Sequence, residues 1–353
     1  MNETLAECSK GRNNNLNLIR FTAACLVIIS HAYPLTSTGQ TEDFCSFITN
    51  GTLTLGGVAV SIFFFYGGFL IMKSLDRIQL AFPYFKARIL RIIPPLAFVT
   101  FMLTFVFGPL LTTKDFLSYM TDGRTYKYLL NSVLILVHHL PGVFENNFYG
   151  AAVNGPLWTL PVEFLCYILC FVFYKLGFVK KVKWTILPVF AIYFCADFFF
   201  MNHSSLLRAA LRPMMLFYMG MLAYIYRDKI RPGFQGFVVG TCILIFGMFL
   251  NHILPIYDFF IIIAFPLILL YLGFGCTHKF ASFGTKCECS YGMYLCAFPI
   301  QQSLVCFFPE MTPLMNMIAS IPLSVAGGIV IYYLIEKPIQ NKLRKSNHSK
   351  SRN

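Results

Sequence analysis

The sequence predicts an all-α, polytopic integral membrane protein, and three observations lead to this fold class. Of the 353 residues, 57% are hydrophobic and only 12% are charged, whereas about a quarter of the residues in soluble domains are charged. Aromatic residues reach 17%, with 39 Phe among them. Long apolar stretches recur along the whole chain, as in proteins that cross a bilayer several times. Together these features exclude a soluble enzyme.

Ten apolar stretches are long enough for membrane helices, because about 20 helical residues cross the hydrocarbon core. In chain order they are residues 16–35, 51–72, 92–112, 157–178, 184–201, 206–226, 234–252, 255–275, 289–308 and 313–335. An eleventh stretch, residues 128–140, is too short to span the membrane and has His138 and His139 near its end. We therefore expect about ten transmembrane helices, plus one re-entrant or interfacial helix over residues 128–140.

Basic residues set the orientation, since Lys and Arg collect in the cytoplasmic loops of membrane proteins. If residues 128–140 stay on the outer side, 22 of the 28 Lys and Arg lie inside, 3 lie outside and 3 lie within spans. If that stretch crosses, every later loop flips, leaving 7 inside and 18 outside. We therefore expect both termini in the cytoplasm. The same count explains the net charge of +13, so nucleic-acid binding is not expected.

One membrane-embedded domain accounts for the chain. It comprises a cytoplasmic tail (1–15), a ten-helix bundle (16–335) and a basic cytoplasmic tail (336–353). The first span is not expected to be a cleaved signal peptide, because it contains charged and polar residues and no small-residue cleavage site follows it. The 12 Cys lie mostly in apolar stretches and show no disulfide framework or zinc spacing. Cys287 and Cys289 have no suitable neighbouring ligands, so no metal site is expected.

Arg20 and His31 in the first span form the first candidate site. Charge inside a membrane is costly and points to function. Eleven residues correspond to three helical turns plus about 20°, and to a rise of about 16 Å. The two side chains therefore share one helix face at two depths. A snorkelling Arg and a simply packed His are the alternative.

Arg88 and Arg91 form the second candidate site, at the cytoplasmic start of the third span. Their i, i+3 spacing places both guanidinium groups on one helix face. The paired N–H donors of two guanidinium groups suit a phosphate group. The alternative is a pair of orientation charges that contact lipid headgroups.

Glu163 is the third candidate, near the outer end of the fourth span. A carboxylate at this depth is not expected to face lipid. It can act as a general base, orient His31, or serve as counter-ion to Arg208 and Arg212 in a structural ion pair. Asp197 and Asp258 lie near outer helix ends, and we expect them to be solvated.

The order and spacing of several motifs resemble those of the membrane-bound acyltransferase 3 family, over nearly the whole chain. The motifs are Arg20-x10-His31, residues 63–71 in the second span, the pair Arg88 and Arg91, residues 158–163, and Ile335-Glu-Lys-Pro338. Two positions depart from the pattern. Gly67 stands where many relatives have Ser, and Ala297 stands where relatives often have His, which weakens a catalytic role for that helix.

The resemblance implies an O-acyltransferase of the bacterial cytoplasmic (inner) membrane. It would transfer an acyl group, usually acetyl, from cytoplasmic acyl-CoA (acetyl-CoA) to a surface-glycan hydroxyl. Acceptors of this class are O-antigen of lipopolysaccharide, capsule, exopolysaccharide or a lipid-linked saccharide. Some relatives carry an extra C-terminal hydrolase-like domain, whereas this chain stops at a basic tail. We therefore expect it to act alone or with a separate periplasmic or glycan-assembly partner.

The residues and the resemblance together predict a division of roles. Arg88 and Arg91 hold the donor phosphates, and Arg20 guides the pantetheine arm or the thioester. His31 acts as general base or accepts the acyl group, with Glu163 tuning its tautomer or basicity. The sugar approaches from outside near residues 113–156, whose polar and aromatic surface includes Tyr126, Tyr128, His138, His139 and Asn146.

A proton-coupled secondary transporter is the main alternative, since intramembrane Arg, His and Glu also occur in such carriers. Transporters commonly contain two related halves with broken helices, and this sequence shows no corresponding pair. A flippase or assembly protein without catalysis is a third possibility. We expect the acyltransferase.

Overall fold

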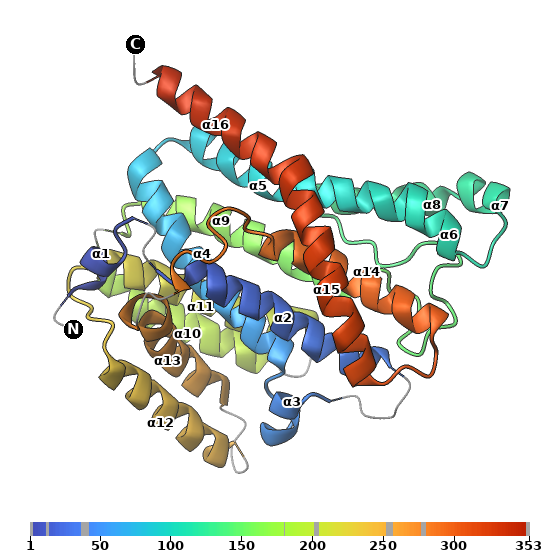
Figure 1. Cartoon of the computed structure of the whole chain (residues 1–353). Coiled ribbons are helices and arrows are strands. Elements are labelled where there is room, and N and C mark those ends of the chain that lie inside the picture. Colours follow the sequence, from blue (N-terminus) through green and yellow to red (C-terminus); the bar gives the residue numbers. More distant parts are fainter. Residues whose placement is uncertain are drawn as a thin grey trace. The chain divides into compact units, whose positions relative to one another are not determined.

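A computed structural model describes residues 3–11, 14–36, 42–179, 181–200, 205–251, 257–276 and 280–350. These residues form helices and no β-strand, apart from an isolated antiparallel bridge between Thr112 and Val143 (Figure 1). The predicted all-α class is thus confirmed for the described part of the chain. Residues 351–353 of the predicted basic tail and parts of the predicted N-terminal tail lie outside it.

Helices occupy all ten predicted apolar stretches, and the largest difference is at α5, which begins eleven residues before the predicted start at residue 92. They are α2 (Leu16–Leu35), α4 (Leu55–Ile78), α5 (Ala81–Met102) with a π-helical turn (Leu103–Phe107) and α6 (Gly108–Leu111), a 3-10 turn (Gly155–Trp158) with α9 (Thr159–Lys175), α10 (Lys183–Phe200), α11 (Ser205–Ile225), α12 (Phe234–Leu250), α13 (Tyr257–Leu270) with a π-helical turn (Tyr271–Gly275), α14 (Ser290–Phe307), and α15 (Pro313–Ile331) with a π-helical turn (Tyr332–Glu336). The remaining helices are α1 (Leu5–Cys8), α3 (Phe44–Ile48), α7 (Phe116–Thr121), α8 (Gly123–Lys127) and α16 (Lys337–Lys350).

Six helical segments of the described chain are long and apolar enough to cross a membrane. They are Leu16–Leu35, Leu55–Ile78, Ala81–Leu111, Gly155–Lys175, Tyr257–Gly275 and Pro313–Leu343. Ala209–Ile225 and Phe234–Leu250 are shorter apolar helices. The structure is therefore that of a polytopic membrane protein, while the number of ten spans stays a prediction.

The prediction of one re-entrant or interfacial helix over residues 128–140 is wrong in its extent. A 3-10 turn covers Tyr128–Val133, directly after α8, and residues 134–140 are not helical. Leu134 adopts the left-handed conformation, with φ of 65°, which ends a right-handed helix. The Asn131 side chain then bonds the carbonyl oxygen and the amide of Val137 at 2.9 and 3.1 Å. This bridge folds the chain back, a feature that apolar composition does not reveal.

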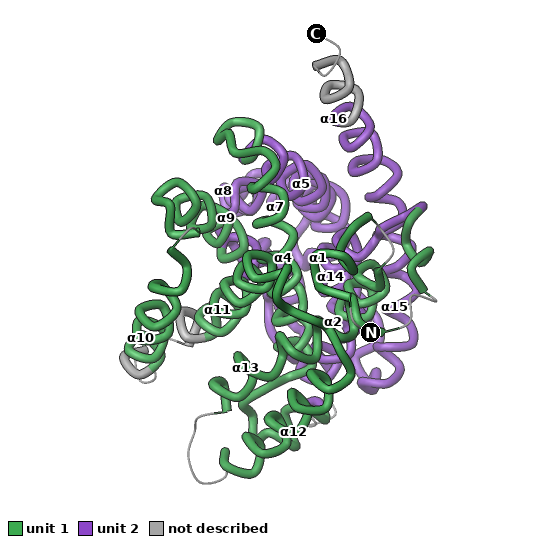
Figure 2. Tube along the Cα trace, turned by 90° about the vertical axis from the view of Figure 1, so that its left-hand side faces the viewer, with its two compact units in different colours: residues 1–23, 44–84, 162–285 green, residues 24–43, 85–161, 286–353 purple. Residues whose placement is uncertain are grey.

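The chain divides into two compact units that are discontinuous in sequence (Figure 2). Unit 1 comprises Met1–Ala23, Phe44–Tyr84 and Val162–Thr285, and unit 2 comprises Ala24–Asp43, Phe85–Pro161 and Lys286–Asn353. Each is described by itself below.

In unit 1, α4 and α11 pack with their backbones in contact. A Cβ atom on Gly68 would lie 1.9 Å from the carbonyl oxygen of Phe217, and one on Gly220 would lie 2.0 Å from that of Phe65. Only glycine allows such an approach, as at many membrane helix crossings. Gly67, the first departure from the family pattern, is different, because a Cβ there would lie 3.7 Å from the Phe217 ring. The crossing therefore requires Gly68 and not Gly67.

In unit 2, α14 packs on α15 in the same way near the end that carries Gly292 and Gly328. A Cβ on Gly292 would lie 2.8 Å from the Cα of Gly328. Near the other end of the pair, Gln301 donates a hydrogen bond of 2.8 Å to the side-chain oxygen of Asn316. Both amides are almost fully buried, and such a polar pair joins helices in an apolar medium.

Candidate functional site

Arg20 and His31 lie on one uninterrupted helix, α2, as the sequence predicts. Arg20 belongs to the part of α2 in unit 1, and His31 belongs to the part in unit 2. Both side chains are partly buried. Eleven residues of regular helix place them about 16 Å apart along the axis.

The His31 ring is oriented by its own helix. Its Nδ1 lies 2.8 Å from the carbonyl oxygen of Val27, one turn earlier. A carbonyl oxygen only accepts hydrogen bonds, so this contact requires the proton on Nδ1 of the neutral ring. The lone pair of the imidazole is then on Nε2. His31 is thus prepared to take a proton or to attack a carbonyl through Nε2.

Phe298 of α14 forms an aromatic wall beside His31. The two rings meet edge to face, with centroids 5.4 Å apart and planes at 82°. Tyr149 packs on the same Phe298 ring at 5.8 Å. A Cβ atom on Gly155 would lie 3.3 Å from this ring, so the glycine before Pro156 lets the loop approach. Phe298 is one of many Phe in apolar stretches, so nothing in the sequence distinguishes it as a neighbour of His31.

Two consecutive glutamines of α14 hold the surroundings of this wall together. Besides Asn316, Gln301 donates to the carbonyl oxygen of Ile28 on α2, at 2.9 Å. Gln302 donates to the carbonyl oxygens of Gly150 and Ala152 at 3.1 and 2.9 Å. These contacts connect α2 and the loop before Asn154 to α14. Two consecutive glutamines inside an apolar stretch are the feature of the sequence that indicates such a buried polar network.

Glu163 lies in the second turn of α9 and belongs to unit 1. Tyr167, one turn later, donates a hydrogen bond to Oε1 of Glu163. The carbonyl oxygen of Tyr167 accepts a bond of 3.0 Å from the Tyr84 hydroxyl. The carboxylate is therefore held by a buried tyrosine that is itself anchored.

The possible role of Glu163 as counter-ion to Arg212 is not what the structure shows. Arg212 instead forms an ion pair of 2.8 Å with Asp258 and donates to the carbonyl oxygen of Thr52 at 3.1 Å. The Asp258 side chain is 24% exposed, so Asp258 is ion-paired and only partly solvated. Helix packing between α11 and α13 brings the pair together. The side chain of Arg208, the other expected partner, lies outside the described residues.

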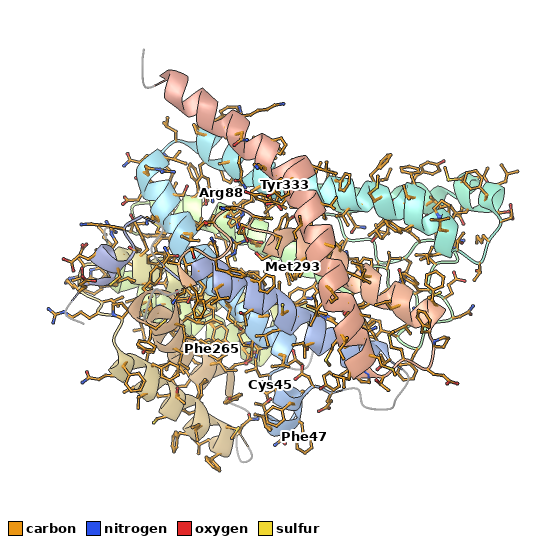
Figure 3. All side chains as sticks on the ribbon, in the orientation of Figure 1. Cys45, Phe47, Arg88, Phe265, Met293 and Tyr333 are labelled. Carbon is orange, nitrogen blue, oxygen red and sulfur yellow. The ribbon has the colours of Figure 1, made fainter. Side chains whose placement is uncertain are left out.

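Arg88 and Arg91 line one pocket of about 250 Å³ in unit 2. Helix α5 begins at Ala81 and includes both arginines, so the two residues lie on one helix face, as their spacing predicts. Two carboxylates, Glu288 and Glu336, line the same pocket, together with Ala87, Leu90, Ile339, Gln340 and Leu343. Figure 3 labels Arg88 on α5 and Tyr333 on the π-helical turn that ends in Glu336. The carboxylates were not assigned to this site from the sequence.

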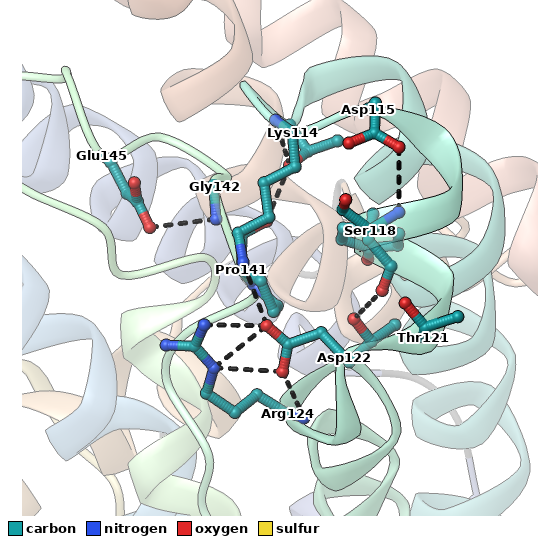
Figure 4. Close-up of polar contacts among 12 residues, drawn as sticks. Lys114, Asp115, Ser118, Thr121, Asp122, Arg124, Pro141, Gly142 and Glu145 are labelled. Carbon is teal, nitrogen blue, oxygen red and sulfur yellow. Dashed lines mark hydrogen bonds and ion pairs between the residues drawn. The ribbon is translucent and has the colours of Figure 1, made fainter.

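The segment of residues 112–156, predicted to lie on the outer side, is held together by ion pairs and by hydrogen bonds to its backbone. Asp122 forms ion pairs with Lys114 at 3.1 Å and Arg124 at 2.7 Å (Figure 4). Hydrogen bonds from Arg124, and then from Lys114, hold the pKa of Asp122 well below its ordinary value. Gly142 donates its amide to the Glu145 carboxylate at 2.9 Å. These contacts stabilise the conformation of the segment.

Four of the five expected sugar-facing residues are accessible in this segment. Tyr126, His139 and Asn146 are exposed, and His138 is partly buried. Tyr128 is fully buried, so its expected place on the surface is wrong. Burial, and then the neighbouring His139, lower the pKa of His138. Among the described residues, no cluster of three His, Cys, Asp or Glu is arranged to hold a metal ion.

Comparison with known proteins agrees with the motifs. The sequence pattern of an acyltransferase domain, that of the acyltransferase 3 family, matches residues 13–333. An "O-acetyl transferase" of Shigella phage Sf6 is 34% identical over 159 residues, which cover 45% of this chain and 45% of that protein. "Nodulation protein 10" of Rhizobium leguminosarum bv. viciae is 32% identical over 171 residues, or 46% of this chain and 44% of that protein. The chain thus matches less than half the length of these curated relatives. No solved structure matches.

Proposed function

This chain belongs to the acyltransferase 3 family, and on that premise we propose that it is an integral membrane O-acyltransferase. It transfers an acetyl group from cytoplasmic acetyl-CoA to a hydroxyl of a surface carbohydrate such as O-antigen, capsule or exopolysaccharide. The family match over residues 13–333 and the similarity to an O-acetyl transferase support this proposal. The protein resides in the bacterial inner membrane with both termini in the cytoplasm, as its basic loops indicate.

The geometry of His31 is the observation that carries the proposal. With Nδ1 bonded to the Val27 carbonyl, Nε2 takes the proton of the acceptor hydroxyl. The alkoxide oxygen then bonds to the acyl carbon, the C–S bond breaks, and the proton passes from Nε2 to the departing thiolate. In the second variant, Nε2 attacks the acyl carbon, the C–S bond breaks and the thiolate of the donor leaves. The acceptor hydroxyl oxygen then bonds to the acyl carbon, the C–N bond to Nε2 breaks, and the hydroxyl proton passes to the thiolate. Both variants use the same nitrogen atom.

The donor is held from the cytoplasmic side. Arg88 and Arg91 line a pocket of unit 2, the unit that also contains His31, and their guanidinium groups suit the donor phosphates. Arg20 guides the thioester arm along α2. Glu163, held by the Tyr167 hydroxyl, remains a proposed catalytic residue at the outer side.

Mass spectrometry of surface glycans tests the activity directly. Cells with this protein should carry glycans heavier by one acetyl group than cells without it, and purified protein with labelled acetyl-CoA should transfer the label to the glycan. The transporter alternative predicts proton-coupled solute uptake and unchanged glycan masses. Unchanged masses in every surface glycan would overturn the proposed function.

A further inference from the structure

The arginine pocket of unit 2 contains as many carboxylates as guanidinium groups. Arg88 and Arg91 come from α5, Glu288 precedes α14, and Glu336 ends the π-helical turn after α15. Glu336 is only 8% exposed. Burying a carboxylate costs several kcal/mol unless nearby charges compensate, and the two arginines of the same pocket supply that compensation, so Glu336 is part of the charge balance of the pocket. π-Helical turns are rare and often lie at functional sites.

Charge balance makes this pocket a poor site for a simple anion. Two guanidinium groups and two carboxylates leave no net formal charge, so the attraction for a bare phosphate is small. A ligand binds well here only if it presents an anion to the arginines and hydrogen-bond donors to the carboxylates. The phosphates of a nucleotide meet the first requirement, and its ribose hydroxyls and base amino group meet the second.

The walls of the pocket favour a nucleotide over a zwitterionic lipid headgroup, which also combines phosphate with a donor. Leu90 and Ile339 on opposing helices, with Ala87 and Leu343, supply aliphatic surface between the charges. Such surface covers the flat face of a base favourably, whereas it strips water from an ammonium group at a cost. The volume of about 250 Å³ is below the range of sites that enclose a whole drug-sized ligand. It therefore accepts one part of a donor as large as acetyl-CoA.

We propose that Glu288 and Glu336 are specificity residues that make this pocket select the nucleotide portion of the donor over other phosphates. The inference rests on the proposed function, because it assumes that the donor reaches this pocket. Arg88 and Arg91 bind the phosphate groups, and the two carboxylates accept hydrogen bonds from the ribose or the base.

Competition with labelled acetyl-CoA on the purified full-length protein tests the inference. The competing probes are adenosine 3′,5′-bisphosphate, inorganic pyrophosphate and glycerophosphoethanolamine. In the wild type, the bisphosphate should displace the donor at concentrations about tenfold or more below those of either other probe, the effect of at least one hydrogen bond to a charged group.

The variants Glu288→Gln and Glu336→Gln should bind the bisphosphate more weakly than the wild type does. They should bind pyrophosphate equally well or more tightly, because each substitution removes a negative charge. The preference for the bisphosphate over pyrophosphate should fall about tenfold. The KM for the donor should rise, while kcat is retained. Glu310→Gln is the matched control, since Glu310 is exposed in the turn between α14 and α15, outside the pocket. If buried Glu336→Gln does not fold, Glu288→Gln decides the question alone.

An unchanged ratio in the variants, or a wild type that prefers glycerophosphoethanolamine or pyrophosphate, overturns the inference. Acetyl transfer with no nucleotide preference would overturn it and leave the proposed function standing. Nucleotide selectivity without any acetyl transfer would support the proposed selectivity of this pocket and contradict the proposed acetyltransferase function.

Discussion

His31 and Val27 are linked by a contact of 2.8 Å between the ring Nδ1 and the backbone carbonyl oxygen, within a single turn of α2. The contact needs no other helix, so His31 holds its tautomer wherever α2 is formed. A backbone partner also cannot be removed by a single side-chain substitution. The reactive properties of Nε2 are therefore set by local helical geometry.

Replacing His31 with Ala should reduce acetyl transfer by about 10²–10⁴-fold, the usual contribution of a general base. Membrane insertion should be unaffected, because α2 becomes no less apolar. Transfer of labelled acetyl groups by purified protein measures the effect, with Ser303→Ala as a control in which a partly buried hydroxyl bonded to its own helix is removed. Full activity of His31→Ala would mean that this ring is only a packing element.

Glu163→Gln should lower kcat by about ten- to a hundredfold, as expected for losing a charged hydrogen-bond acceptor. Donor binding should stay intact, because Arg88 and Arg91 are unchanged. Tyr167→Phe removes the hydroxyl that bonds the carboxylate and should cause a smaller loss of the same kind. Steady-state kinetics and acetyl-CoA binding separate the two quantities. A defect in donor binding alone would contradict the assignment of Glu163 to catalysis.

Gly68→Ala and Gly220→Ala should each destabilise the protein by about 3 kcal/mol, because the new Cβ overlaps a backbone oxygen. Gly67→Ala should have little effect, since its Cβ meets the Phe217 ring only at an ordinary contact distance. Thermal unfolding in detergent compares the adjacent positions directly. Equal sensitivity at Gly67 and Gly68 would contradict the observed crossing of α4 and α11.

Asp258→Asn should destabilise unit 1 by about 1–3 kcal/mol, because it leaves the partly buried Arg212 without its ionic partner. Replacing both residues by Leu should recover part of this loss, since no uncompensated charge remains. Unfolding measurements should show no comparable change in Asp228→Asn, at an exposed position. If the effects of replacing Arg212 and Asp258 by Leu one at a time add up to the effect of replacing both, the two side chains are not directly coupled.

Lowering the pH from about 7.5 to 5 should destabilise the segment around His138. Burial and His139 lower the pKa of His138 in the folded state, so its favourable contribution is present above the ordinary pKa of about 6.5. That contribution is lost as the pH falls through the folded-state pKa. Hydrogen exchange of residues near His138 should accelerate accordingly, and His138→Gln should weaken the pH dependence. An increase in protection at low pH would reverse the expected sign.

Local sequence was sufficient to identify the helices and two of the candidate pairs. The apolar stretch of residues 16–35 matches α2 residue for residue, because hydrogen bonds four residues apart and the apolar medium decide helix formation. The spacing of Arg88 and Arg91 likewise placed them on one face, now seen in one pocket. The helix expected over residues 128–140 failed because a side-chain bridge from Asn131 and a left-handed Leu134 replace it.

The sequence by itself determined the all-α membrane class, the helix positions and the residues whose chemistry stands out against apolar surroundings. Only the tertiary structure decided which helix faces meet: Phe298 beside His31, Asp258 rather than Glu163 beside Arg212, and Glu336 in the pocket of Arg88. These partners lie tens to hundreds of residues apart in the chain. In nearly uniformly apolar helices the residue pattern does not mark the inward face, and close packing of small residues selects the neighbours instead.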